Sequence, residues 1–145
     1  MLEVSRYLCL AGALPFVVLG LAHAAATPLT TAQARGLSPR DPALRDAMAR
    51  DSVLLTRRTT LWLAWVGFNL SHSLGAVLFG SVMMLIARSP SSFQAQGSVF
   101  LPLAVLVSAA YLILGLRYWF RTPTIGISLS SVGFLASWVL FARAG

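Results

Sequence analysis

Four long apolar runs alternate with polar segments along this chain. A helix needs about 20 mostly apolar residues to cross the hydrocarbon core of a bilayer, and each run is near that length. Their predicted bounds are residues 7–26, 60–87, 99–120 and 124–142. The pattern therefore predicts an all-α, integral membrane four-helix bundle that forms a single transmembrane helical domain over residues 1–145.

The first run has a second interpretation. Its apolar core is followed by the sequence AHA, which resembles the small-residue cleavage site of a secretory signal peptide. Against this, Glu3 offsets Arg6, so the segment before the run lacks the net positive charge of a signal peptide. We interpret residues 7–26 as a retained helix. Cleavage would place the following loop on the other side of the membrane.

The connections between the runs also carry patterns. Ser38 or Asp41 is a candidate N-cap followed by a proline, and two Asp–Arg pairs with i,i+4 spacing follow. One face of this helix would carry Leu44, Ala47, Met48 and Leu55. The 38–56 loop is thus predicted to hold a short amphipathic helix on the membrane surface, or equally a solvated connector with a helical turn or two. The polar segment RSPSSFQAQG, residues 88–97, is expected to be a loop.

Composition and charge agree with the membrane class. The chain is 57% hydrophobic and only 10% charged, whereas soluble domains have about 25% charged residues. Its net charge of +7 comes from eleven arginines, most of which flank apolar runs, so anionic headgroups explain the charge and no nucleic acid is expected. Eight arginines lie on one predicted face and three on the other. The positive-inside rule then places loops 27–59 and 117–123 in the cytoplasm and both termini outside, in a bacterial inner membrane.

Polar residues in the second run fall on two faces of the predicted helix. At about 100° per residue, one face carries Trp62, Trp65, Asn69, His72, Ser73, Ala76 and Gly80. The opposite face carries Gly67, Ser71 and Gly75, a spacing that lets two membrane helices approach closely. We expect the first face to form a polar pocket in the bundle. The second is a helix-packing face that could also serve a homo-oligomer or a protein partner.

His72 is the residue whose pairing most needs an explanation. A neutral imidazole inside a membrane needs a hydrogen-bonding partner, whereas serine hydroxyls can bond back to their own helix. Tyr111 lies at about the same predicted depth on the third helix. We predict a contact between His72 and Tyr111, direct or through water, in a pocket with Asn69 and Ser73. Two roles stay open, a structural hydrogen-bond hub and a site for ligand binding or proton transfer.

Several chemistries are not expected. At about 1.5 Å per residue, His23 lies roughly 5 Å and His72 roughly 18 Å from the inner ends of their helices, which disfavours a haem held by both. Two histidines alone do not make a metal site. Ser73 beside His72 is not a catalytic triad, because helix neighbours diverge and no buried carboxylate is available. We predict no catalytic residue, metal or cofactor.

One part of the chain resembles a known group of proteins. The block LTRRTTLWLAWVGFNLSHSLGAVLFG, preceded by PRDPALRDAM and by GLAHA, resembles a family of small bacterial four-helix integral membrane proteins of uncharacterised function. The resemblance implies architecture and no activity. We expect a multi-pass membrane protein that contacts lipid and is a non-enzymatic interaction, accessory or lipid-binding component. The alternative is a small membrane enzyme, or a carrier of a small apolar ligand, centred on Asn69, His72 and Tyr111 with Trp62 and Trp65 in its pocket.

Overall fold

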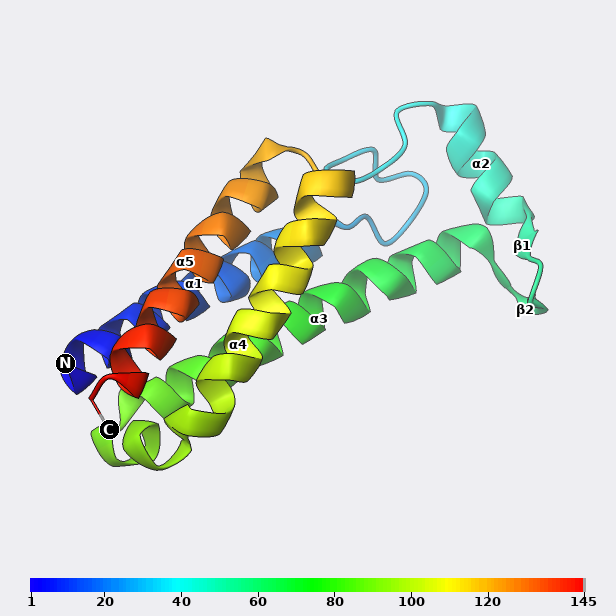
Figure 1. Cartoon of the computed structure of the whole chain (residues 1–145). Helices are drawn as coiled ribbons and strands as arrows, with labels where there is room; N and C mark the ends of the chain where they lie inside the picture. Colours follow the sequence, from blue (N-terminus) through cyan, green and yellow to red (C-terminus); the bar gives the residue numbers. More distant parts are fainter. Residues whose placement is uncertain (145) are drawn as a thin grey trace. The chain divides into compact units, whose positions relative to one another are not determined.

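The computed structural model describes residues 1–144 and is mostly helical (Figure 1). Its elements are α1 (Leu2–Ala26), α2 (Pro42–Arg50), β1 (Ser52–Val53), β2 (Thr56–Thr60), α3 (Leu61–Arg88), α4 (Pro90–Tyr118) and α5 (Arg121–Ala142). Four of them, α1, α3, α4 and α5, are long and apolar enough to cross a membrane. The prediction of an all-α membrane protein with four spanning helices is confirmed.

The chain forms two compact units. The first consists of residues 1–19 together with the chain from residue 76 onward, and the second consists of residues 20–75. Parts of all four spanning helices meet in the first unit, which is a four-helix bundle. The second unit holds the end of α1, the start of α3 and the segment between them. The expectation of a single domain stays a prediction.

The bundle of the first unit has an apolar core to which every spanning helix contributes. Its buried residues are Cys9, Ala13, Phe16, Ala76, Met83, Ile86, Ala87, Phe93, Leu101, Ala104, Ile127 and Phe134. The Phe16 ring centroid lies 4.7 Å from that of Phe79 and 5.2 Å from that of Tyr111, both edge to face. Helix α1 thus supplies part of this core, and its retention in the mature protein stays a prediction.

The backbones of helices α1 and α5 approach each other closely in the bundle. A Cβ added at Gly133 would lie 3.0 Å from the Gly12 Cα, so these two backbones touch. Further along, the Ser5 hydroxyl donates to the Ser137 carbonyl at 2.7 Å, and the Ser137 hydroxyl donates to the Ser5 carbonyl at 2.8 Å. Both serines are fully buried. The small side chains here let the two helix backbones come into contact, as is usual between membrane helices.

The second unit folds its connecting segment back onto the end of α1. The Leu37 amide donates to the Ala26 carbonyl at 3.1 Å. The turn before it needs Gly36, whose φ of +52° lies in the left-handed region, where a Cβ would also collide with Ala26. Arg45 of α2 then donates from Nε to the Thr31 carbonyl at 3.0 Å. These bonds fix the path of the connection between α1 and α2.

The amphipathic helix predicted in the 38–56 loop is present but shorter than its pattern suggested. Asp41 caps it by accepting a hydrogen bond from the Ala43 amide at 2.9 Å, and Pro42 begins it, as the sequence predicted. The helix ends at Arg50. Placing Leu55 on its apolar face was therefore wrong. Residues 52–60 instead form an antiparallel hairpin of β1 and β2, with Leu55 in its loop.

The expectation of a loop at residues 88–97 was also wrong. Ser89 caps α4 by accepting a hydrogen bond from the Ser92 amide, and the helix begins at Pro90. A proline in the first turn costs nothing there, because the amide it lacks would have no helical partner. Gly97 lies inside the helix because the ring of Phe141 occupies the space where a Cβ would be. The polar composition of residues 88–97 thus led us to expect the start of α4 at residue 99, whereas the helix begins at Pro90.

Candidate functional site

The part of the predicted polar face of α3 that runs from Trp62 to Ser73 lies in the second unit. Trp62, Asn69 and Ser73 are buried, whereas Trp65 and His72 are half-buried. The rings of Trp62 and Trp65 contact each other, with centroids 5.3 Å apart. Trp62 Nε1 is buried and has no hydrogen-bonding partner among residues 1–144. The face is therefore a line of packed aromatic and polar side chains.

Asn69 is the hydrogen-bonding centre of this face. Its amide nitrogen donates to the Trp65 carbonyl at 2.7 Å, one turn earlier in α3. Its amide oxygen lies 2.8 Å from Nε2 of His23 on α1. Because that oxygen can only accept, Nε2 of His23 carries the hydrogen and donates it. Asn69 thus satisfies its own helix on one side and ties α1 to α3 on the other.

His72 lies next to His23, a residue that the sequence did not place in the polar pocket. The two imidazole centroids are 5.1 Å apart with the rings edge to face, and the Phe68 ring stacks on His72 at 6.4 Å. The predicted difference in depth between the histidines is therefore wrong. It was counted from the ends of the two helices as if these were level. Helix α3 has 28 residues, about 42 Å, and its first turns precede the level at which α1 ends.

The contact between the two imidazoles also bears on the haem alternative. A porphyrin held by both histidines would have to lie between the two rings. Rings in edge-to-face contact leave no such gap, and Nε2 of His23 already donates to Asn69. Within residues 1–144 there is no group of three or more His, Cys, Asp or Glu side chains that could hold a metal ion. As placed, the pair is part of a packed hydrogen-bonded cluster.

Ser71 and Ser73 both bond to the backbone of their own helix. The Ser73 hydroxyl donates to the Asn69 carbonyl at 2.9 Å, and the Ser71 hydroxyl donates to the Phe68 carbonyl at 2.9 Å. Serine commonly satisfies its hydroxyl in this way in membrane helices. Ser73 is buried beside Asn69, and Ser71 is exposed on the opposite side. Neither hydroxyl needs a partner from another helix.

Tyr111 belongs to the first unit, where its ring contacts those of Phe16 and Trp119 at 5.2 and 6.0 Å. His72 belongs to the second unit. The predicted His72–Tyr111 contact stays a prediction. The partner that the second unit itself supplies to the polar face is His23 of α1. The sequence signal that could have pointed to His23 is its position one turn before the end of α1, because a histidine there can face the neighbouring helix.

The opposite face of α3 is open. Gly67, Ser71 and Gly75 are all exposed, and a Cβ added at either glycine would meet nothing within 4 Å. Other membrane glycines differ. A Cβ at Gly80 would lie 2.9 Å from a backbone carbonyl, and the Gly133 backbone touches that of α1. The small-residue line at Gly67, Ser71 and Gly75 is thus left unused by the described part of the chain.

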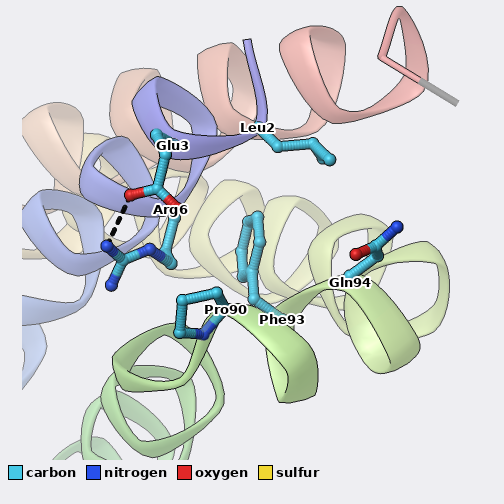
Figure 2. Close-up of a pocket in the computed structure, with 6 residues that line it drawn as sticks. All are labelled: Leu2, Glu3, Arg6, Pro90, Phe93 and Gln94. Atoms are coloured by element: carbon cyan, nitrogen blue, oxygen red, sulfur yellow. Dashed lines mark hydrogen bonds and ion pairs between the residues drawn. The ribbon is translucent and has the colours of Figure 1, made fainter.

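A separate small cavity of about 90 Å³ lies in the first unit, where the start of α1 faces the start of α4 (Figure 2). It is lined by Leu2, Glu3, Arg6, Pro90, Phe93 and Gln94. Arg6 donates to Glu3 at 2.6 Å and to the Ala87 carbonyl at 3.2 Å, near the end of α3. The last carbonyls of a helix lack helical donors, so this arginine caps α3. That structural role accounts for its position.

The chain matches no protein-family model, no curated protein and no solved structure. The resemblance of its central block to small bacterial membrane proteins therefore stays a prediction. The two faces of α3 differ: one is packed and hydrogen-bonded around Asn69, and the other is exposed.

Proposed function

We propose that this chain is a non-enzymatic multi-pass membrane protein that works by association, pairing with a second copy of itself through the Gly67–Ser71–Gly75 face of α3. The observation that carries the proposal is that this face is exposed while other glycines of the spanning helices are in contact. Small residues at this spacing let two backbones approach, and helix pairing in lipid depends on such close packing.

The hydrogen bonds that Asn69 and Ser73 make on the polar face support a non-enzymatic role. Both ends of the Asn69 amide are hydrogen-bonded, and the Ser73 hydroxyl bonds to its own helix. Groups already paired inside the protein offer little to a substrate, because a ligand would have to replace those bonds. The cluster holds the end of α1 against α3. A rigid α3 is what a pairing surface requires.

The Gly67–Ser71–Gly75 face is self-complementary, and this favours a second copy of the chain over an unrelated partner. Two-fold dimers bring the same patch of both subunits together. A flat line of two glycines and a serine, flanked by the exposed side chains of Phe68 and Leu74, can meet its own copy without leaving a charge or a buried polar group unpaired. Ser71 already bonds to its own helix, so desolvating it costs little.

The test is the oligomeric state of the full chain in lipid bilayers. Single-molecule subunit counting in liposomes, over a range of protein-to-lipid ratios, should give dimers for the unchanged chain. The Gly67→Leu, Gly75→Leu variant should be monomeric, because the added side chains hold the helices apart. The matched control is Ala110→Leu, which also enlarges an exposed small residue but on α4. A monomeric unchanged chain, or a variant that still dimerises, would contradict the proposal.

A second candidate, a small membrane enzyme or ligand carrier centred on Asn69, His72 and Tyr111, is favoured by one observation. Two imidazoles from different helices are in contact, an arrangement that buried packing alone does not require. Native mass spectrometry of the purified protein decides this. A stoichiometric bound small molecule that is lost in His72→Ala, with the fold intact, would favour the ligand role. A bare dimer would favour association.

A further inference from the structure

The β1–β2 hairpin of the second unit is a small projecting element. Val53 pairs with Thr56, so Leu54 and Leu55 form its two-residue loop. At its base the Leu61 amide donates to the Asp51 carbonyl at 2.9 Å, which joins the end of α2 to the start of α3. In Figure 1 the hairpin lies to one side of the start of α3 and does not continue its axis.

The two leucines of the loop are the most exposed large apolar side chains of the described residues. Leu54 is 110% and Leu55 94% exposed relative to a free residue, so neither packs on the protein. Turn chemistry does not explain them. Two-residue hairpin loops favour glycine, asparagine and aspartate at positive φ, whereas within residues 1–144 only Gly36 has a positive φ. Two adjacent exposed leucines at such a tip indicate that the tip contacts an apolar environment that the chain itself does not supply.

The strand that follows the tip carries positive charge. Arg57 and Arg58 are both exposed on β2. Neighbouring strand residues point to opposite faces, so the two guanidinium groups flank the hairpin on either side. Asp51, the nearest acidic residue along the chain, lies at the base and accepts a hydrogen bond from the Ser52 amide at 2.8 Å. The apolar tip is thus followed by two arginines. At a membrane surface, acyl chains likewise lie beside phosphate groups, so the hairpin matches that surface in chemistry.

The chain holds this tip close to a membrane boundary. Leu55 precedes the first residue of the spanning helix α3, Leu61, by six positions. At about 3.3 Å per extended residue, the tip stays within about 20 Å of the start of that helix. The half-buried Trp65 follows in the second turn, and tryptophan favours the interface. A tip on so short a tether can reach the headgroups.

We propose that the β1–β2 hairpin binds the bilayer surface, with Leu54 and Leu55 inserted among the outer acyl carbons and Arg57 and Arg58 bound to the phosphates of anionic phospholipids. Arginine contributes to binding at anionic surfaces, and exposed leucine contributes by burying apolar area. The hairpin would tether the 27–60 connection to the membrane. This role is independent of the proposed pairing through Gly67 and Gly75, which lie on the helix itself.

The test measures the depth of the tip in reconstituted full-length chain. Leu55→Cys, in a Cys9→Ala background, carries an environment-sensitive fluorophore, and the liposomes contain phosphatidylcholine alone or mixed with phosphatidylglycerol. Spin-labelled lipids report contact with acyl chains, and iodide reports contact with water. We expect strong lipid quenching and weak iodide quenching, both more pronounced with phosphatidylglycerol. Inorganic phosphate in the buffer should not compete, because the bound phosphates belong to lipid.

Two further samples complete the design. A label at Asp46→Cys, an exposed position on the polar side of α2, should stay accessible to iodide in both membranes. The Arg57→Gln, Arg58→Gln variant should reduce the lipid quenching of the Leu55 label to its value in phosphatidylcholine alone. Iodide quenching that exceeds lipid quenching in every membrane would overturn the proposal. Protection from both quenchers would overturn it as well, since it would place the tip against protein.

Discussion

At the scale of single residues, Asn69 shows how a polar side chain is accommodated in an apolar helix. One end of its amide satisfies a carbonyl of its own helix and the other accepts from His23 of α1. The sequence predicted that Asn69 and His72 share a face, because that follows from helical periodicity alone. It misjudged His23, because the relative height of two helices is set by the connection between them, and periodicity carries no information about it.

We predict that Asn69→Ala lowers the free energy of unfolding by about 1 kcal/mol. An interhelical hydrogen bond in a membrane protein contributes about 0.6 kcal/mol on average, and the substitution also leaves the His23 N–H without its acceptor. Cys9 is fully buried in the bundle core, so its reaction with a thiol dye during denaturant titration reports unfolding. Ser71→Ala is the control and should have no measurable effect, because its hydroxyl is exposed and bonds to its own helix.

At the scale of the elements, the long apolar helices were predictable and the short ones were less so. A run of some 20 apolar residues has few alternatives in a membrane protein, because every backbone group must be paired within the segment. The hairpin at 52–60 has too few residues to show a period. Pro90 looked like a loop residue until the Ser89 cap placed it in the first turn of α4. These boundaries depend on single hydrogen bonds.

The glycines of the spanning helices should differ sharply in their tolerance of substitution. Gly133→Val should lower the free energy of unfolding by about 1–3 kcal/mol, because its side chain would have to displace the backbone of α1 at Gly12. Gly67→Val should leave the stability of the monomer nearly unchanged, since a Cβ there meets nothing within 4 Å. The same thiol-reactivity assay compares the two. Equal losses would contradict the packing described for the first unit.

The cap at the end of α3 gives a second prediction at this scale. Arg6→Ala should lower the free energy of unfolding by more than Glu3→Ala does, because the last carbonyls of α3 lose their donor. Glu3→Ala should have little effect, since the Glu3 side chain is 61% exposed and such ion pairs contribute little. Equilibrium unfolding of both variants in one detergent makes the comparison. A larger effect from Glu3 would show that the ion pair, rather than the cap, positions Arg6.

At the scale of the whole molecule, the arginines predict the orientation. Six lie between residues 27 and 60 and two flank the α4–α5 turn, against three at the other ends of the helices. Arginine near a spanning helix favours the cytoplasmic side. Of those three, Arg6 is held by a carboxylate and helix carbonyls within the protein, which further weakens its influence as a free charge. The long connection should therefore be cytoplasmic, and the α3–α4 turn should face outward.

Cysteine labelling in intact cells measures this orientation. In a Cys9→Ala background, a membrane-impermeant maleimide should label Ser91→Cys, near the start of α4, and should leave Ser52→Cys, at the base of the hairpin, unlabelled until the cells are opened. The retained α1 is part of the same prediction, because its cleavage would move the connection to the outside. The intact mass of the purified protein should then include α1, as expected if Cys9, Ala13 and Phe16 belong to the folded core. Labelling of Ser52→Cys from outside, together with a mass lacking α1, would show that the signal-peptide interpretation is correct and would require the core of the bundle to form without that helix.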